Sequence, residues 1–195
     1  MRRTGVRAEE AYLRARLEQA VQASDSEGER IARVELARYL ARRDRSLDEA
    51  SSLALRAIRA QDDSDLRREL SGWLESLGEA GLAAAVLRPI VEGPSAVDGA
   101  TLIRVGVLHA RAGDPSGANE AFEEAARLDP LAAIGLELRG ALGGWAPEAI
   151  SPAAAAEAYV DAAARRAAAN DDPVEDLLRA FEADPTSDAA ASGLA

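Results

Sequence analysis

The sequence predicts an all-α fold, a solenoid of antiparallel helix pairs, from three observations. The chain of 195 residues is rich in Ala, Leu, Glu and Arg, whose side chains favour helix. Valine and isoleucine occur singly, without the alternating β-branched runs that indicate strands. A large apolar residue followed by a small one recurs at nearly constant spacing, which is typical of a repeat protein.

The recurring pair is Leu36-Ala37, then Leu70-Ser71, then Val105-Gly106, at spacings of 34 and 35 residues. A second small residue follows each pair at a similar spacing: Ala50, Ala83 and Ala118. Small residues on both sides allow two helices to approach closely. A larger residue such as Phe122 is expected to fill the remaining gap. The pattern therefore predicts stacked helix pairs.

These positions resemble the tetratricopeptide repeat, a helix–turn–helix unit of 34 residues. The best copy is 99–132, and the positions that match the family's pattern are Leu102, Val105, Gly106, Ala118, Phe122, Ala125 and Pro130. The resemblance implies a right-handed superhelix of about four repeats with one extra helix and loop. We expect the chain to be a fragment of a longer bacterial array.

The elements are predicted in the following order along the chain. A lone helix at 8–24 precedes repeats at 30–63, 64–97 and 99–132, an extra helix and loop at 131–153, a weaker repeat at 154–187, and the start of another at 188–195. In the extra segment we expect a helix over 131–142 and a loop over 143–147, because the loop holds two glycines and a proline. Pro89 is expected to kink its helix or end it near Leu87.

Several short segments predict turns and helix ends. In Gly113-Asp114 the glycine tolerates a positive φ and the aspartate caps the next helix, in whose first turn Pro115 fits. Asp171-Asp172 and Pro173 repeat this arrangement. Asp129-Pro130 and Asp184-Pro185 are expected to end helices, because a proline disfavours helical geometry in the residue before it.

The sequence contains no catalytic constellation, so we predict that the chain is not an enzyme and binds neither a cofactor nor a metal. It has no cysteine and one histidine, His109, which we expect to be half-buried in helix packing. Glu120, Glu123 and Glu124 share one helix face and are predicted to be a solvated surface. Asp62, Asp63 and Asp65 are predicted to lie in a loop and at a helix N-terminus.

The formal net charge of −11 makes nucleic-acid binding an unlikely function. No apolar run approaches the roughly 20 residues of a membrane span. The first residues lack the apolar segment of a secretory signal. The default prediction is therefore a cytoplasmic protein that binds neither nucleic acid nor membrane.

The resemblance implies that the first helices of the repeats line a concave groove that binds peptides or helices. When the family's groove positions are transferred to each repeat of this sequence, the twenty positions hold six arginines and two acidic residues. The predicted partner-binding residues there are Arg38, Arg42, Arg68, Ile103, Val107, Arg111, Arg165 and Arg166; the weakest copy also places Ala155, Ala158 and Ala162 in the groove. Because arginine pairs carboxylates in a fixed fork, we expect a partner that can be acidic. The Lys and Asn of the family's chaperone-binding clamp are missing from their positions.

Trp145 is the other candidate for a partner contact, since it lies in the predicted loop and outside the repeat phase. Its alternative role is to anchor that loop on the solenoid. The sequence thus favours a protein–protein interaction scaffold. Two alternatives are self-assembly into oligomers through exposed solenoid ends and a role as the regulatory arm of a larger enzyme.

Overall fold

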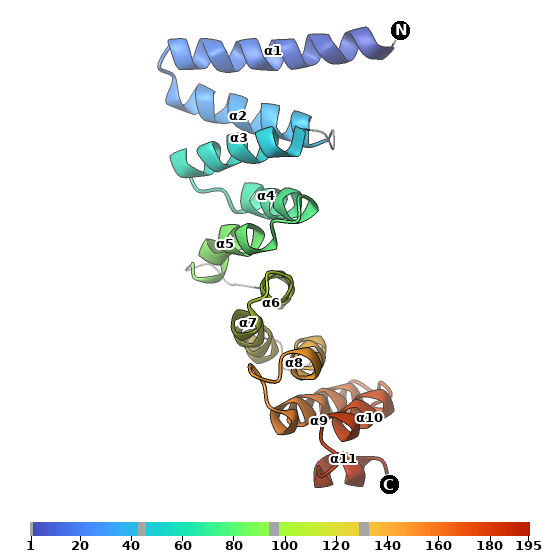
Figure 1. The fold of residues 1–195 in the computed structure, drawn as a ribbon. Coiled ribbons are helices and arrows are strands. Elements are labelled where there is room, and N and C mark those ends of the chain that lie inside the picture. The colour runs from blue at the N-terminus through green and yellow to red at the C-terminus, as the bar shows by residue number, and fades with distance from the viewer. Residues whose placement is uncertain (1, 43–45, 94–97, 129–132) are drawn as a thin grey trace. The chain divides into compact units, whose positions relative to one another are not determined.

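The computed structural model describes residues 2–42, 46–93, 98–128 and 133–195, which form helices and no strand (Figure 1). The helices are α1 (Arg2–Gln22), α2 (Ser26–Ala41), α3 (Leu47–Ala60), α4 (Ser64–Ser76), α5 (Ala80–Val91), α6 (Gly99–Arg111), α7 (Pro115–Leu128), α8 (Ile134–Trp145), α9 (Pro152–Ala168), α10 (Val174–Ala183) and α11 (Asp188–Gly193). The chain divides into two compact units, 1–87 and 88–195. The all-α prediction is confirmed.

In the first unit, consecutive helices pack against each other from α1 to α4. The predicted small residues are fully buried: Ala37 of α2 and Ala50 of α3 lie in helices that pack against each other, and Ala83 lies in α5. A hydrogen bond joins α4 to α5: Nη1 of Arg67 donates to the carbonyl oxygen of Val86 at 3.2 Å. The recurring small residues therefore permit close helix packing, as predicted.

Pro89 does not end its helix early, so that part of the prediction is wrong. It lies inside α5, which continues to Val91. The proline removes one backbone N–H, whose acceptor would be the carbonyl of Ala85. Both residues are exposed, so water can satisfy that carbonyl.

In the second unit, α6 and α7 form the best-matching repeat. A Cβ atom added to Gly106 would lie 2.4 Å from Cε1 of Phe122, so only glycine allows the ring to pack there. Ala118 and Ala125 are buried beside the ring. The predicted roles of the small residues and of Phe122 are confirmed here. Pro130, the last matching position, falls outside the described residues.

The next helix pair, α8 and α9, repeats this arrangement. A Cβ atom added to Gly140 of α8 would lie 2.6 Å from Cε2 of Tyr159 in α9. The matching residues are Ala118, Phe122 and Ala125 in α7 and Ala155, Tyr159 and Ala162 in α9. Because contacts and spacing agree, the structure favours a different division from the predicted one. Here α8 is the first helix of a repeat and α9 is its second.

The last two helices continue the second unit. Ala180 of α10 and Ala190 of α11 are fully buried, in a cluster with Ala156 and Tyr159 of α9. Helix α10 also contacts α8. We therefore take α10 as the first helix of the next pair, so that α8 and α10 occupy equivalent places in successive repeats.

The predicted turn chemistry is present at Gly113-Asp114 and at Asp63, but it differs before α10. There Pro173 is the N-cap residue and does not lie in the first turn, and Oδ1 of Asp172 accepts a hydrogen bond from the Val174 N–H at 3.0 Å. Gly113 has a φ of 76°, and Oδ1 of Asp114 accepts a hydrogen bond from the Gly117 N–H at 3.0 Å. Asp63 caps α4 by accepting from the Leu66 N–H at 3.0 Å. Helix α10 ends at Ala183, directly before Asp184-Pro185. The other predicted stop, Asp129-Pro130, lies outside the described residues.

Candidate partner-binding face

Two predicted arginines of the first unit, Arg38 and Arg68, pair with acids of the chain. Arg38 of α2 binds Glu69 of α4 through two atoms, with Nε 3.0 Å from Oε2 and Nη2 2.8 Å from Oε1. The hydrogen bonds that Arg38 donates to the Glu69 carboxylate raise the pKa of Arg38. Arg68 pairs with Asp65 at 3.2 Å. The chain itself therefore supplies the counterions of Arg38 and Arg68. Glu69 was not among the predicted groove positions, so the sequence prediction did not include it.

Arg42 caps the C-terminus of α2 and is exposed. With Arg38, Ala41, Glu69 and Trp73 it lines a shallow hollow of about 460 Å³. Trp73 is half-buried there, so the first unit offers one small hollow of mixed charge at this place.

The positions predicted from α9 do not form an open groove, and this is a correction. Ala155, Ala158 and Ala162 are buried, because α9 is packed against both α8 and α10. Nη1 of Arg165 donates to the carbonyl oxygen of Ala126 at 3.1 Å. These residues occupy the interior of the helix stack.

Arg166 joins three helices of the second unit. Its Nε donates to Oδ2 of Asp176 in α10 at 2.8 Å, and its Nη2 forms an ion pair with Glu137 of α8. Asp176 is only 2% exposed. The hydrogen bond that Arg166 donates to the Glu137 carboxylate is the main cause of the raised pKa of Arg166. This geometry gives Arg166 a structural contact to each neighbouring helix.

The predicted residues of α6 differ in exposure. Ile103 and Val107 are half-buried, and Val107 packs against the core cluster that contains Phe122 and Leu142. Arg111, the last residue of α6, is exposed. Of these three residues, Arg111 is therefore the one most open to a partner.

Trp145 is the last residue of α8 and does not lie in a loop, which corrects the predicted 143–147 loop. Glycines disfavour helix, but Gly143 is needed here because a Cβ atom on it would lie 2.6 Å from Cβ of Ala155. Trp145 follows Arg111 by 34 residues, so both occupy the same place in successive first helices. Its side chain is 54% exposed.

The structure adds a set of apolar residues that the sequence interpretation missed. On α10, Val174, Leu178 and Phe181 follow each other at i, i+4 and i+7, and each is between 41% and 49% exposed. This spacing places them along one side of the helix. The buried apolar residues of α10, Leu177 and Ala180, lie on a neighbouring side.

Helix α8 carries the same stripe in the same register. Relative to the buried Gly140, the α8 residues Ile134, Leu138 and Ala141 lie at positions −6, −2 and +1. Relative to the buried Ala180, the α10 residues Val174, Leu178 and Phe181 lie at the same three positions. Ile134 is 49% exposed, and Leu138 is half-buried. Equivalent positions of successive first helices share one side of a repeat stack. We name these residues the α8–α10 apolar face: Ile134, Leu138, Ala141, Trp145, Val174, Leu178 and Phe181.

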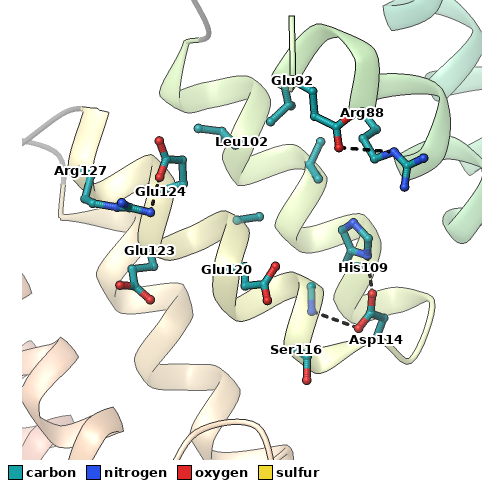
Figure 2. Close-up of a pocket in the computed structure, with 14 residues that line it drawn as sticks. Arg88, Glu92, Leu102, His109, Asp114, Ser116, Glu120, Glu123, Glu124 and Arg127 are labelled. Carbon is teal, nitrogen blue, oxygen red and sulfur yellow. Dashed lines mark hydrogen bonds and ion pairs between the residues drawn. The ribbon is translucent and has the colours of Figure 1, made fainter.

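Another hollow, of about 770 Å³, lies in the second unit over α6 and α7 (Figure 2). At one end, Nδ1 of His109 is 2.7 Å from Oδ2 of Asp114. The pKa of Asp114 is lowered, mainly by the Gly117 N–H and also by His109. His109 is half-buried, as predicted. Because Asp114 caps α7, this pair stabilises the turn between the two helices.

The rim of the same hollow carries the predicted acidic residues. Glu120 and Glu123 are exposed, and Glu124 forms an ion pair with Arg127 (Figure 2). Across the described residues, no group of three or more His, Asp or Glu side chains is placed to hold a metal ion. No helix in the described part of the chain is both long and apolar enough to cross a bilayer.

Comparison with known proteins identifies the fold. No family model matches the sequence, and no curated protein is significantly similar to it. Among solved structures, the chain is similar to the MamA protein, with a TM-score of 0.57 at 14% identity over 82% of this chain and 87% of that one. It is also similar to the C-terminal part of a TPR repeat-containing protein from Cytophaga hutchinsonii, with a TM-score of 0.57 at 13% identity, covering 95% of this chain and 88% of that one.

The chain is thus an all-α helical-repeat protein. Its fold is that of the tetratricopeptide repeat, as the spacing of small and large residues predicted.

Proposed function

We propose that this protein is an interaction module that binds a peptide or helix of a partner protein on the α8–α10 apolar face. The observation that carries the proposal is the pair of matching exposed stripes. Large apolar side chains exposed together mark interaction sites in soluble proteins. The face also lies on first helices, which in tetratricopeptide arrays line the groove where partners bind.

The energy of binding would come mainly from the aromatic side chains. Trp145 and Phe181 are about half exposed, so a partner can still remove much of their surface from water. Burial is worth about 25 cal/mol per Å² of apolar surface, and aromatic residues dominate many interfaces. Trp145 keeps its predicted role as a partner contact in this proposal.

We assign the predicted basic character of the groove to two exposed arginines at helix ends, Arg42 and Arg111. Arg42 in the first unit and Arg111 in the second are placed where they could pair with carboxylates of a partner. Arg38, Arg68, Arg165 and Arg166 each have an acceptor within the chain. Because Arg38, Arg165 and Arg166 each contact another helix, we assign them to the packing of the stack. Arg68 pairs within α4, and Ile103 and Val107 contribute apolar surface beside Arg111.

Affinity capture from a cell lysate tests this function. The parent chain is compared with a Trp145→Ser, Phe181→Ser variant and with a control, Tyr12→Ser, Leu82→Ser. The control residues are exposed apolar side chains of the first unit. We expect the parent and the control to retain the same proteins, and the face variant to lose them. Equal capture by all three would contradict the proposal.

A second pair of variants tests the arginines separately. Arg111→Glu reverses an exposed charge next to the face, and Arg42→Glu does the same in the first unit. If the groove selects carboxylates, capture by Arg111→Glu falls while the apolar face is intact. Unchanged capture would remove Arg111 from the site.

A further inference from the structure

We infer that the partner of the α8–α10 apolar face is a positively charged amphipathic helix. This inference rests on the proposed function and specifies the chemistry of the partner. Three features carry it: the paired stripes, the contact between the two helices, and the acidic residues around α10.

The shape of the face suits a helix. Each of α8 and α10 presents apolar side chains at i, i+4 and i+7, and the two helices contact each other. Two adjacent ridged helices form a groove that accepts the ridge of a third. A partner helix with apolar residues at the same spacing would fill it, which is a known way for a helix to bind a groove.

The charge beside the face selects the sign of the partner. Residues 171–195 contain seven acidic residues and one arginine. Glu175 and Glu182 directly follow Val174 and Phe181, with Arg179 between them, so this exposed side of α10 carries a net negative charge along the apolar stripe. Arg179 pairs with Glu175, whereas Asp176 already has Arg166 as its partner.

A basic partner gains from this arrangement and an acidic one does not. Lys or Arg side chains flanking the apolar stripe of a bound helix would lie near Glu175 and Glu182. Opposite charges across an interface raise the association rate and favour the correct partner, while like charges oppose binding. The acidic residues of α10 therefore disfavour, at this face, the acidic partner that the number of arginines had suggested.

Three synthetic peptides of roughly 18 residues, long enough to form a helix, test the inference. The first has Leu on one helical stripe and Lys elsewhere; the second replaces every Lys by Glu; the third keeps Lys and replaces every Leu by Ser. The chain has two tryptophans, so Trp73→Phe leaves Trp145 as the sole reporter. Titrations follow the Trp145 emission at about 0.15 M ionic strength, which screens weak surface attraction.

We expect saturable binding of the Lys–Leu peptide with a blue shift of Trp145, and at least about tenfold weaker binding of the other two peptides. Phe181→Ser in the same background should weaken binding of the Lys–Leu peptide at least about tenfold. The control Leu82→Ser, at an exposed residue, should leave that binding unchanged. The Glu175→Gln, Glu182→Gln variant should bind the Lys–Leu peptide more weakly and the Glu–Leu peptide more tightly than the parent does.

The remaining outcomes overturn the inference in distinguishable ways. Tighter, Phe181-dependent binding of the Glu–Leu peptide would leave the proposed function intact and contradict the basic partner. Equal binding of the Lys–Ser peptide would show general attraction to an acidic protein and contradict an apolar site. If no peptide binds through Phe181, both proposals fail. A dimer in sedimentation that Phe181→Ser dissociates would show that a second copy occupies the face.

Discussion

Gly140 of α8 lies against the ring of Tyr159 of α9, at a distance that leaves no room for a side chain. The same relationship joins Gly106 of α6 to Phe122 of α7. In both pairs a glycine on the first helix meets an aromatic ring on the second. This contact defines the helix pair and places α8 as a first helix, with its apolar stripe on the side where we propose that the partner binds.

Gly140→Ala should lower the free energy of unfolding by about 2 kcal/mol, because the new Cβ atom would overpack the Tyr159 ring. Gly144→Ala is the matched control in the same helix. A Cβ atom there meets nothing within 4 Å, so we expect a gain of about 0.5 kcal/mol from helix propensity. Denaturant unfolding measures both. Equal effects would contradict the close glycine–ring contact.

The fold was predictable because close helix pairs require small and large residues at fixed places, and this pattern recurs in the sequence. Gly106, Ala118 and Phe122 could be recognised at fixed offsets even though no family model matches the chain. The register after residue 130 was not predictable in this way. Gly140 keeps the 34-residue spacing from Gly106, but the connection between α8 and α9 is longer than in the preceding pair, so Tyr159 follows Phe122 by 37 residues.

Ser71→Ala should raise the free energy of unfolding by about 1 kcal/mol, because a buried hydroxyl without a partner is removed. Ser71 is fully buried, and its Oγ has no hydrogen-bond partner among the described residues. Its equivalents, Ala37 and Gly106, are also small. Ser76→Ala is the control, since Ser76 is exposed and its Oγ donates to the Gly72 carbonyl at 3.0 Å. A loss of stability in Ser71→Ala would disprove the explanation.

Arg166→Leu should cost about 3 kcal/mol of stability, because it leaves the buried carboxylate of Asp176 without its partner. Adding Asp176→Asn should restore at least about 1 kcal/mol, since the uncompensated charge is then gone. The exposed Arg127, paired with Glu124, provides a control, and Arg127→Leu should change stability by less than about 1 kcal/mol. Strict additivity of the Arg166 and Asp176 substitutions would argue against their coupling.

The cap at Asp114 predicts a pH dependence. Because folding lowers the pKa of Asp114, its contribution is complete above its unfolded pKa of about 3.9 and is lost as the pH falls through the lower folded value. Asp114→Ala should cost about 1 kcal/mol at pH 7, where the cap is ionised. The difference from the parent should shrink below about pH 4. A difference that stays constant down to pH 2 would refute an ionised cap.

The candidate site was only partly predictable. Trp145 could be selected as an unusual exposed aromatic, but its helical position depended on Gly143, whose need for close packing appears only in three dimensions. On α10, the exposed stripe and the buried residues Leu177 and Ala180 are interleaved in sequence. Composition alone therefore could not separate Phe181 from the core. Nor could it pair Arg38 with Glu69, which lies 31 residues away.

The most direct test of the central claim is acrylamide quenching of Trp145, in a Trp73→Phe background, with and without the protein obtained by affinity capture. Trp145 is about half exposed, so we expect strong quenching of the free chain and clear protection in the complex. Unchanged quenching in the presence of a bound partner would contradict the account, because the partner would then bind away from the α8–α10 apolar face.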